Sequence, residues 1–206
     1  MKQKETEENK KEEKGRSMIE MLGVLAIAGV ITMAGIAGYS KAMETYKFNK
    51  QVDQISRAAS EIRGFYAASG EDGYEGLNAD LLISLVPEMG TTNSSVTYID
   101  STSTVLNSYG GALSVRPINT RDVSNERVTN GGFAIGIAGL SKPACIKLAA
   151  HNWKDAKVEG VSINRAAVYS DFSTTSGQWL TVPADPTRVK NWCSKASNNQ
   201  VYFAFK

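Results

Sequence analysis

The sequence contains a single histidine, His151, among its 206 residues. Nucleophilic catalysis of the Ser-His type needs a histidine as the general base, and most zinc sites use at least one. No P-loop and no Cys-x-x-Cys motif is present either. We therefore predict that the protein is not an enzyme and needs no cofactor or metal. His151 lies beside Trp153 at the end of an expected helix, and we predict a surface or capping role for it. The candidate acidic residues are scattered through expected loops: Asp80, Asp100, Asp155, Asp171 and Asp185.

The sequence also has no large excess of charge of either sign, because the formal net charge is only +2. Outside the N-terminal tail the basic residues are not grouped with aromatic residues, so the sequence shows no nucleic-acid footprint. Only two cysteines occur, Cys145 and Cys193. In an exported domain such a pair is most simply a disulfide, which would stabilise the domain by about 4 kcal/mol by loss of loop entropy. Two buried thiols in a cytosolic domain are the alternative.

Charged residues are absent from Met21 to Tyr39, and proline is absent before Pro87. As a helix, this uncharged run would extend roughly 28 Å, which matches the ~30 Å hydrocarbon core of a membrane. The absence of proline allows the helix to continue from about Ser17 to Ala68. Its second half is predicted to be amphipathic and to pack on a domain. The expected inward residues are Val52, Ile55, Ala59, Ile62 and Tyr66, and the expected outward residues are Lys50, Asp53, Arg57 and Glu61.

The N-terminal tail, residues 1–14, holds five lysines and five glutamates, and it cannot fold alone. A secretory signal is normally cut beyond its apolar region, whereas here the small residue Gly15 precedes the apolar run. Cleavage at Gly15 would leave the membrane span on the mature protein, and an uncleaved cytoplasmic tail is the alternative. Glu20 lies at the start of the run, where a carboxylate is costly unless a cation pairs with it.

Residues 14–20, Lys-Gly-Arg-Ser-Met-Ile-Glu, followed by the apolar run, resemble the class III signal of type IV pilins and type II secretion pseudopilins. The resemblance implies that a prepilin peptidase cuts after Gly15 and methylates the new amine of Arg16. It also implies that Glu20 pairs with the N-terminal amine of a neighbouring subunit and sets the register of assembly. Arg16 departs from the family pattern, in which the first mature residue is usually apolar.

The head region begins with residues 69–110, which are rich in Ser, Gly, Thr and Asn and predict loops with one short helix at Leu81 to Val86. After it, Ser141 as a cap and Pro143 in the first turn predict a helix that carries Cys145 against a sheet. Strands separated by this helix indicate an α+β domain with an antiparallel sheet. The expected strands are Ala112 to Val115, Phe133 to Leu140, Gln178 to Val182 and Val201 to Phe205.

Glycine is frequent in the second of these strands, which contains Gly132, Gly136 and Gly139. Their spacing does not fit a dinucleotide-binding loop. We expect them instead to let a central strand lie close to the long helix.

The order of features in the head is similar to that of type IVb pilins of enteric bacteria: Tyr109-Gly110-Gly111, the helix with Ala144-Cys145, a late second cysteine and a closing Val-Tyr-Phe strand. This resemblance implies the pilin fold, with a long N-terminal helix packed on an antiparallel head that a disulfide closes. The implied segments are a cleaved leader (1–15), a membrane and filament-core helix (16–40), its amphipathic half (41–68) and the head (69–206).

The implied function is that of a major pilin, polymerised through its N-terminal helix for adhesion, aggregation or conjugative contact. The chain would lie in the inner membrane before assembly and in a surface pilus afterwards. Its partners would be other copies of itself, the prepilin peptidase, an assembly ATPase, a platform protein and a secretin. A minor pilin or a secretion pseudopilin is the alternative within the family, and a single-span protein with an exported binding domain or enzyme is the alternative outside it.

Overall fold

The computed structural model describes residues 2–69, 73–87, 105–165, 172 and 177–206, with side chains in the first helix from Met18 to Ala68. The chain divides into two compact units, Met1–Tyr46 and Lys47–Lys206. Asp100 and Asp171 lie outside the described residues.

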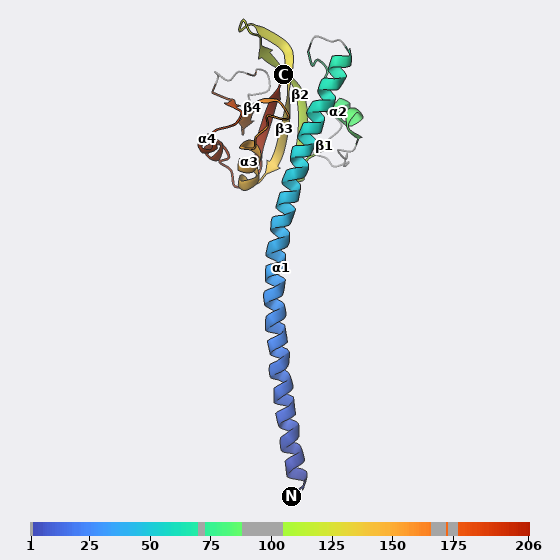
Figure 1. The fold of residues 1–206 in the computed structure, drawn as a ribbon, viewed down its shortest axis with the longest axis vertical. Coiled ribbons are helices and arrows are strands. Elements are labelled where there is room, and N and C mark those ends of the chain that lie inside the picture. Colours follow the sequence, from blue (N-terminus) through green and yellow to red (C-terminus); the bar gives the residue numbers. More distant parts are fainter. Residues whose placement is uncertain (1, 70–72, 88–104, 166–171, 173–176) are drawn as a thin grey trace. The chain divides into compact units, whose positions relative to one another are not determined.

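Helix α1 spans Lys2–Ser69 and is drawn from blue to green in Figure 1. Its C-terminal end agrees with the predicted Ala68, but the predicted start at Ser17 was wrong. Lysine and glutamate are good helix formers, and adding a residue to an existing helix is far easier than nucleating a new one. The charged tail therefore continues the helix of the apolar run, although it has no core of its own.

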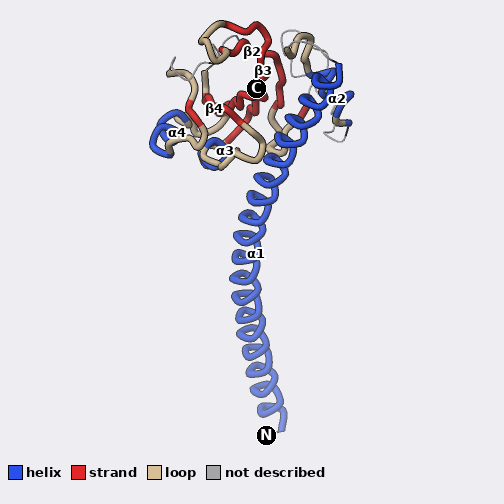
Figure 2. Tube along the Cα trace, turned by 45° about the horizontal axis from the view of Figure 1, so that its top comes forward, coloured by secondary structure: helices blue, strands red, loops and turns tan. Residues whose placement is uncertain are grey.

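The second unit contains a six-stranded sheet in the order β1-β2-β3-β6-β4-β5. All its neighbouring strands pair antiparallel, which confirms the predicted fold class. The last strand of the chain lies between β3 and β4, so the C-terminus is held inside the sheet rather than at its edge (Figures 1 and 2). The strands are β1 (Val105–Leu106), β2 (Ala112–Arg121), β3 (Arg127–Leu140), β4 (Val158–Ile163), β5 (Leu180–Thr181) and β6 (Asn199–Phe205).

In the described part of the head, three shorter helices accompany the sheet: α2 (Ala79–Leu85), α3 (Lys142–Ala149) and α4 (Pro186–Trp192). The predicted short helix and the predicted Ser141 cap are confirmed, since the Ser141 hydroxyl accepts a hydrogen bond from the amide of Ala144. Helix α4 was not predicted. Its signal was present in Asp185 and Pro186, because Asp185 caps the helix by accepting from the amide of Thr187 at 2.9 Å and Pro186 opens the first turn.

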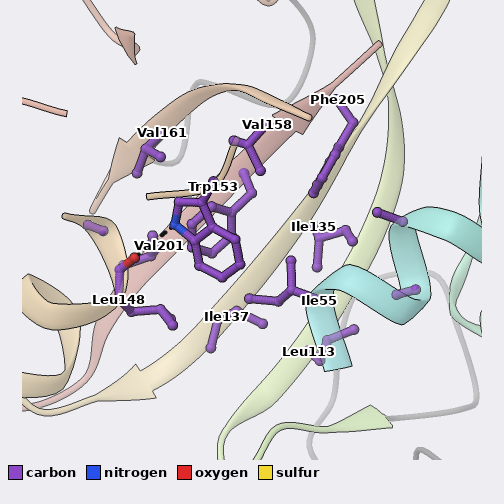
Figure 3. Close-up of a cluster of buried hydrophobic side chains, with 14 of the residues drawn as sticks. Ile55, Leu113, Ile135, Ile137, Leu148, Trp153, Val158, Val161, Val201 and Phe205 are labelled. Atoms are coloured by element: carbon purple, nitrogen blue, oxygen red, sulfur yellow. Dashed lines mark hydrogen bonds between the residues drawn. The ribbon is translucent and has the colours of Figure 1, made fainter. Parts of the chain in front are cut away.

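The main core lies on one face of the sheet, between the strands and the second half of α1 (Figure 3). Ile55 and Ile62 of the helix belong to the same buried cluster as Ile135 and Ile137 of β3. Trp153 is also fully enclosed, and its indole Nε1 donates to the carbonyl of Leu148 at 3.0 Å. This face therefore carries most of the hydrophobic stabilisation of the head.

The opposite face of the sheet carries a smaller cluster, which includes Trp179 and Tyr202. Gly136 belongs to this face, because a Cβ added there would lie 2.7 Å from a ring carbon of Tyr202. Gly132 also faces strand neighbours, with Thr120 and the carbonyl of Phe205 around it. The prediction that these glycines bring the strand close to the long helix was therefore wrong; they make room for side chains on the far face.

Candidate functional site

The apolar run of α1 is exposed on all sides within its compact unit. Side chains from Met18 to Tyr39 are solvent-accessible in every direction around the helix, with Ile19 at 72% and Ile36 at 61%. The helix is long and apolar enough to cross a membrane. A helix that is apolar all round is stable only when lipid or other helices cover it, so this segment needs surroundings that the chain itself does not supply.

The hydroxyl groups of Thr32, within this run, and of Ser40, directly after it, form hydrogen bonds inside the helix. Thr32 Oγ1 donates to the carbonyl of Ala28 at 2.7 Å, and Ser40 Oγ donates to the carbonyl of Ile36 at 2.9 Å. These bonds allow the segment to enter an environment without water. The glycines of the run have no packing role against the residues that the structure describes, since a Cβ added at any of them meets nothing within 4 Å; they are Gly23, Gly29, Gly35 and Gly38.

The three residues expected to control processing and assembly all lie within α1: Gly15, Arg16 and Glu20. The side chain of Glu20 is exposed, and it forms no ion pair with any side chain that the structure describes. The ion pair found among those side chains joins Arg57 and Asp53 at 3.0 Å. A carboxylate next to an apolar surface therefore remains available to a cation from outside the described part of the chain. Cleavage, methylation and the role of Glu20 stay predictions.

The second half of α1 follows its predicted amphipathic pattern. Ile55, Ala59, Ile62 and Tyr66 are buried, and Val52 is partly buried against the same core. The residues predicted to point outward are exposed: Lys50, Asp53, Arg57 and Glu61.

Arg63 anchors this half of the helix and was not predicted to do so. Its guanidinium donates to the carbonyls of Ala156 at 3.1 Å, Lys157 at 3.1 Å and Lys206 at 3.3 Å. It also lies over the ring of Phe205, 5.3 Å from the centroid. One side chain thus fastens the helix to the segment before β4 and to the C-terminal residue.

The glycine-containing turn that supported the family resemblance is fixed by Asn107. Its Oδ1 accepts from the amides of Tyr109 at 2.9 Å and Gly111 at 3.2 Å, and its Nδ2 donates to Ala138 at 2.8 Å. Gly110 has φ +84°, and a Cβ on Gly111 would clash with the carbonyl of Ala138. Both glycines are therefore required by the turn itself.

The neighbouring loop residue Ser108 joins this turn to α1. Its amide donates to Oε1 of the fully buried Gln51 at 2.9 Å, and its hydroxyl donates to the carbonyl of Lys47 at 2.7 Å. The burial of Gln51 was not predicted, because a glutamine on an amphipathic helix normally indicates the solvent-exposed side.

The predicted disulfide is present between Cys145 of α3 and Cys193, which follows α4, with 6.0 Å between their Cα atoms. Both cysteines are fully buried. The bond joins two short helices that pack side by side (Figures 1 and 2). The buried Asn199 makes a second link in the head, since it donates to the carbonyl of Leu140 at 3.2 Å and accepts from Asn164 at 2.9 Å.

Among the described residues, no group of three His, Cys, Asp or Glu side chains is placed to hold a metal ion. His151 is half-buried, and its ring packs edge-on against Trp153 and Phe48, with centroids 4.9 and 5.4 Å away. Burial lowers the pKa of His151 below its ordinary value of 6.5, and the charge of Asp155 opposes this shift. The aromatic contacts give the imidazole a packing role at the end of α3.

A long helix with an apolar first half and a disulfide-closed α+β head together define the type IV pilin fold. The protein family described as PilS N terminal matches residues 45–206. Two Escherichia coli proteins named "Major structural subunit of bundle-forming pilus", from O111:H- and O127:H6, are 31% identical over 205 residues. The alignment covers 96% of this chain and 97% of each relative. The chain belongs to the type IVb pilin family, as the sequence predicted.

Solved structures agree on the fold. A type IVb pilin from Salmonella typhi aligns with a TM-score of 0.51 and 17% identity, covering 77% of this chain and 99% of that one. TcpA, a type IV pilin from Vibrio cholerae El Tor, aligns with a TM-score of 0.51 and 16% identity, covering 78% and 99%.

Proposed function

We propose that this chain is the major structural subunit of a type IVb pilus. The observation that carries the proposal is the apolar run of α1, which is exposed on all sides while the head has a complete core of its own. Full-length relatives that are named as major subunits of a bundle-forming pilus support it. An apolar helix of this kind on a self-sufficient domain is suited to polymerisation, because copies of the helix can bury one another.

In the proposed sequence of events, prepilin peptidase cuts after Gly15 and methylates the amine of Arg16. The apolar run then anchors the subunit in the inner membrane, and it moves from lipid into the core of a filament as the pilus grows. Each large apolar side chain that passes from water-exposed to fully buried contributes about 1.5–3 kcal/mol, so lipid or neighbouring helices must cover the run at every stage. The family resemblance supplies the assembly ATPase, the platform protein and the secretin as partners.

Glu20 is proposed to pair with the N-terminal amine of an adjacent subunit in the filament. Its carboxylate has no ion-pair partner among the described side chains. A single charge buried among apolar helices is strongly unfavourable, whereas a paired charge is tolerated, so the pair selects the axial position at which two subunits fit. The head would then face outward and provide contacts for adhesion, aggregation or mating.

The first experiment is mass analysis of the N-terminus in filaments sheared from cells. We expect a chain that begins at a methylated Arg16, and we expect it to be the most abundant protein of the filament. Retention of residues 1–15 would contradict the proposal. A trace amount in filaments built mainly of another pilin would instead identify a minor subunit.

Glu20→Ala tests the assembly step. The variant is expected to be processed and to remain in the membrane but to form few filaments, because the incoming amine loses its partner. Glu44→Ala is the matched control, since Glu44 is an exposed carboxylate of the same helix beyond the apolar run. Normal filament yield from Glu20→Ala, measured by electron microscopy and immunoblotting of sheared material, would refute the role of Glu20.

A further inference from the structure

Two arginine side chains lie over the ring of one tryptophan at the surface of the head. The guanidinium carbon of Arg165 lies 4.5 Å from the ring centroid of Trp192, and that of Arg188 lies 5.3 Å from it. Both arginines are exposed, and the indole is half-buried. Arg188 and Trp192 lie one turn apart on α4, whereas Arg165 comes from the segment after β4. Two cations from separate elements therefore lie against the ring of the same tryptophan.

The backbone beneath this cluster is fixed. Asn164, with φ +56°, donates from Nδ2 to the carbonyl of Trp192 at 2.9 Å and accepts at Oδ1 from the amide of Gln200 at 2.9 Å. Cys193, next to the tryptophan, is held by the disulfide. The ends of β4 and α4 are therefore tied together, and the two arginines start from fixed positions before any ligand arrives.

The positive charge of the cluster is not neutralised within the described part of the chain. Neither arginine forms an ion pair there. Asp185, the carboxylate at the start of α4, accepts a hydrogen bond from the amide of Thr187 and forms no ion pair with either arginine. Lys190 and Lys195 are exposed nearby in the sequence and add to the positive potential. Like charges held together repel, so an anion that bridges them gains more than it would from one isolated arginine.

We propose that Arg165, Arg188 and Trp192 form a binding site for a phosphate monoester. Stacking on the ring occupies the flat face of a guanidinium and leaves its N–H groups free to donate in the plane. One carboxylate is satisfied by a single arginine fork. A phosphate monoester carries about −1.5 to −2 charges and three acceptor oxygens, so it matches two forks and two charges. The site binds the phosphate group, so phosphate esters of a sugar and of glycerol are both candidate sources of the ligand.

The test uses the full-length, ¹⁵N-labelled chain in a non-ionic detergent. The indole N–H signal of Trp192, assigned with Trp192→Phe, is followed during titration with inorganic phosphate, and sodium acetate at equal ionic strength is the control. We expect a saturable shift with phosphate and a much weaker response to acetate. Equal responses to the two anions, or no saturable shift with phosphate, would overturn the proposal.

Arg165→Gln and Arg188→Gln are each expected to weaken phosphate binding about tenfold, as expected for the loss of charge-assisted hydrogen bonds. Arg57→Gln is the matched control, because Arg57 is an exposed arginine on α1 that already has a carboxylate partner. Unchanged signals of the buried Trp153 and Trp179 will show that each variant is folded. Unchanged binding in both site variants, or equal weakening by Arg57→Gln, would refute the assignment.

Glucose 6-phosphate and glycerol 3-phosphate then separate a sugar source from a glycerol source, according to which ester binds more tightly. Failure of both esters to bind, where inorganic phosphate does bind, would exclude the monoester as the ligand. None of these outcomes affects the proposed role in a pilus, because the measurement is made on the unassembled chain.

Discussion

Replacing Cys145 and Cys193 together by alanine is expected to lower the free energy of unfolding of the head by about 4 kcal/mol. The two cysteines are 48 positions apart. By the dependence of chain entropy on loop length, closing such a loop destabilises the unfolded state by about 4 kcal/mol. Domains of this kind are stable by only about 5–15 kcal/mol, so the loss would remove a large share of the total.

Urea denaturation followed by tryptophan fluorescence measures this change, with the full-length chain in a non-ionic detergent. The sequence has three tryptophans and the first is Trp153, so the signal reports on the head and not on the apolar run. Trp153 and Trp179 are buried, and their emission will change when the head unfolds.

The wild-type protein in reductant is the control, because it keeps both sulfur atoms and loses only the bond. A further loss in the alanine variant then measures the packing of the buried sulfurs. If both the reduced protein and the double variant unfold within about 1 kcal/mol of the oxidised protein, loop entropy is not the source of the stability, since the entropy of so long a loop predicts much more.

Other substitutions test single contacts of the head by the same measurement. Arg63→Lys keeps the charge but loses the guanidinium group that reaches three carbonyls, so it is expected to destabilise the head by about 2–3 kcal/mol. The control Arg57→Lys is expected to cost less than about 0.5 kcal/mol. Equal effects of the two substitutions would contradict the anchoring role of Arg63. Gly111→Ala is expected to destabilise by about 2 kcal/mol or more because its methyl group meets the carbonyl of Ala138, whereas Gly64→Ala in open space on α1 should stabilise by about 0.5–1 kcal/mol. Because the pKa of His151 is lowered on folding, its neutral form favours the folded state. The contribution of His151 to stability is therefore full above pH 6.5 and falls as the pH drops below that value. The difference in unfolding free energy between wild type and His151→Gln should stay constant above pH 6.5 and change below it.

The features that were predicted correctly from the sequence depend on local signals, namely apolar residues that recur at a regular spacing and a capping residue, or on a pair of cysteines that react with each other. Ile55, Ala59 and Ile62 recur at helical spacing, and this spacing places them on one face wherever the helix lies. Two cysteines in a chain with an export segment have few alternatives to pairing. The Ser141 cap with Pro143 is a local signal that needs no knowledge of the tertiary fold. Each of these predictions used information contained within a short stretch or a unique pair.

The strand glycines show where such information ends. The sequence indicated that Gly132 and Gly136 need space, but it could not indicate on which side of the sheet. Alternation assigns them to the face opposite Phe133 and Ile135, and which of the two faces meets α1 depends on the pairing of β3 with β6, far along the chain. A shift of the β3–β6 register by one residue would have turned Gly132 and Gly136 towards the face that meets α1. The error therefore arose from long-range pairing and not from a misread local preference.

The polar residues that escaped prediction share a different property: most of their partners are backbone groups. Asn107 and Asn199 each use their amides to hold carbonyls or N–H groups of distant segments, and Arg63 holds three carbonyls. Every residue carries these backbone groups, so no complementary side chain elsewhere in the sequence marks the partner. Asn164 also binds a backbone group, and its bond to the carbonyl of Trp192 joins the segment after β4 to the end of α4. An asparagine that binds main-chain atoms can be replaced only by a residue with the same reach and the same donors, and Asn164→Asp, which keeps the shape but replaces the Nδ2 donor by a charged oxygen, is therefore expected to lose the bond to the carbonyl of Trp192.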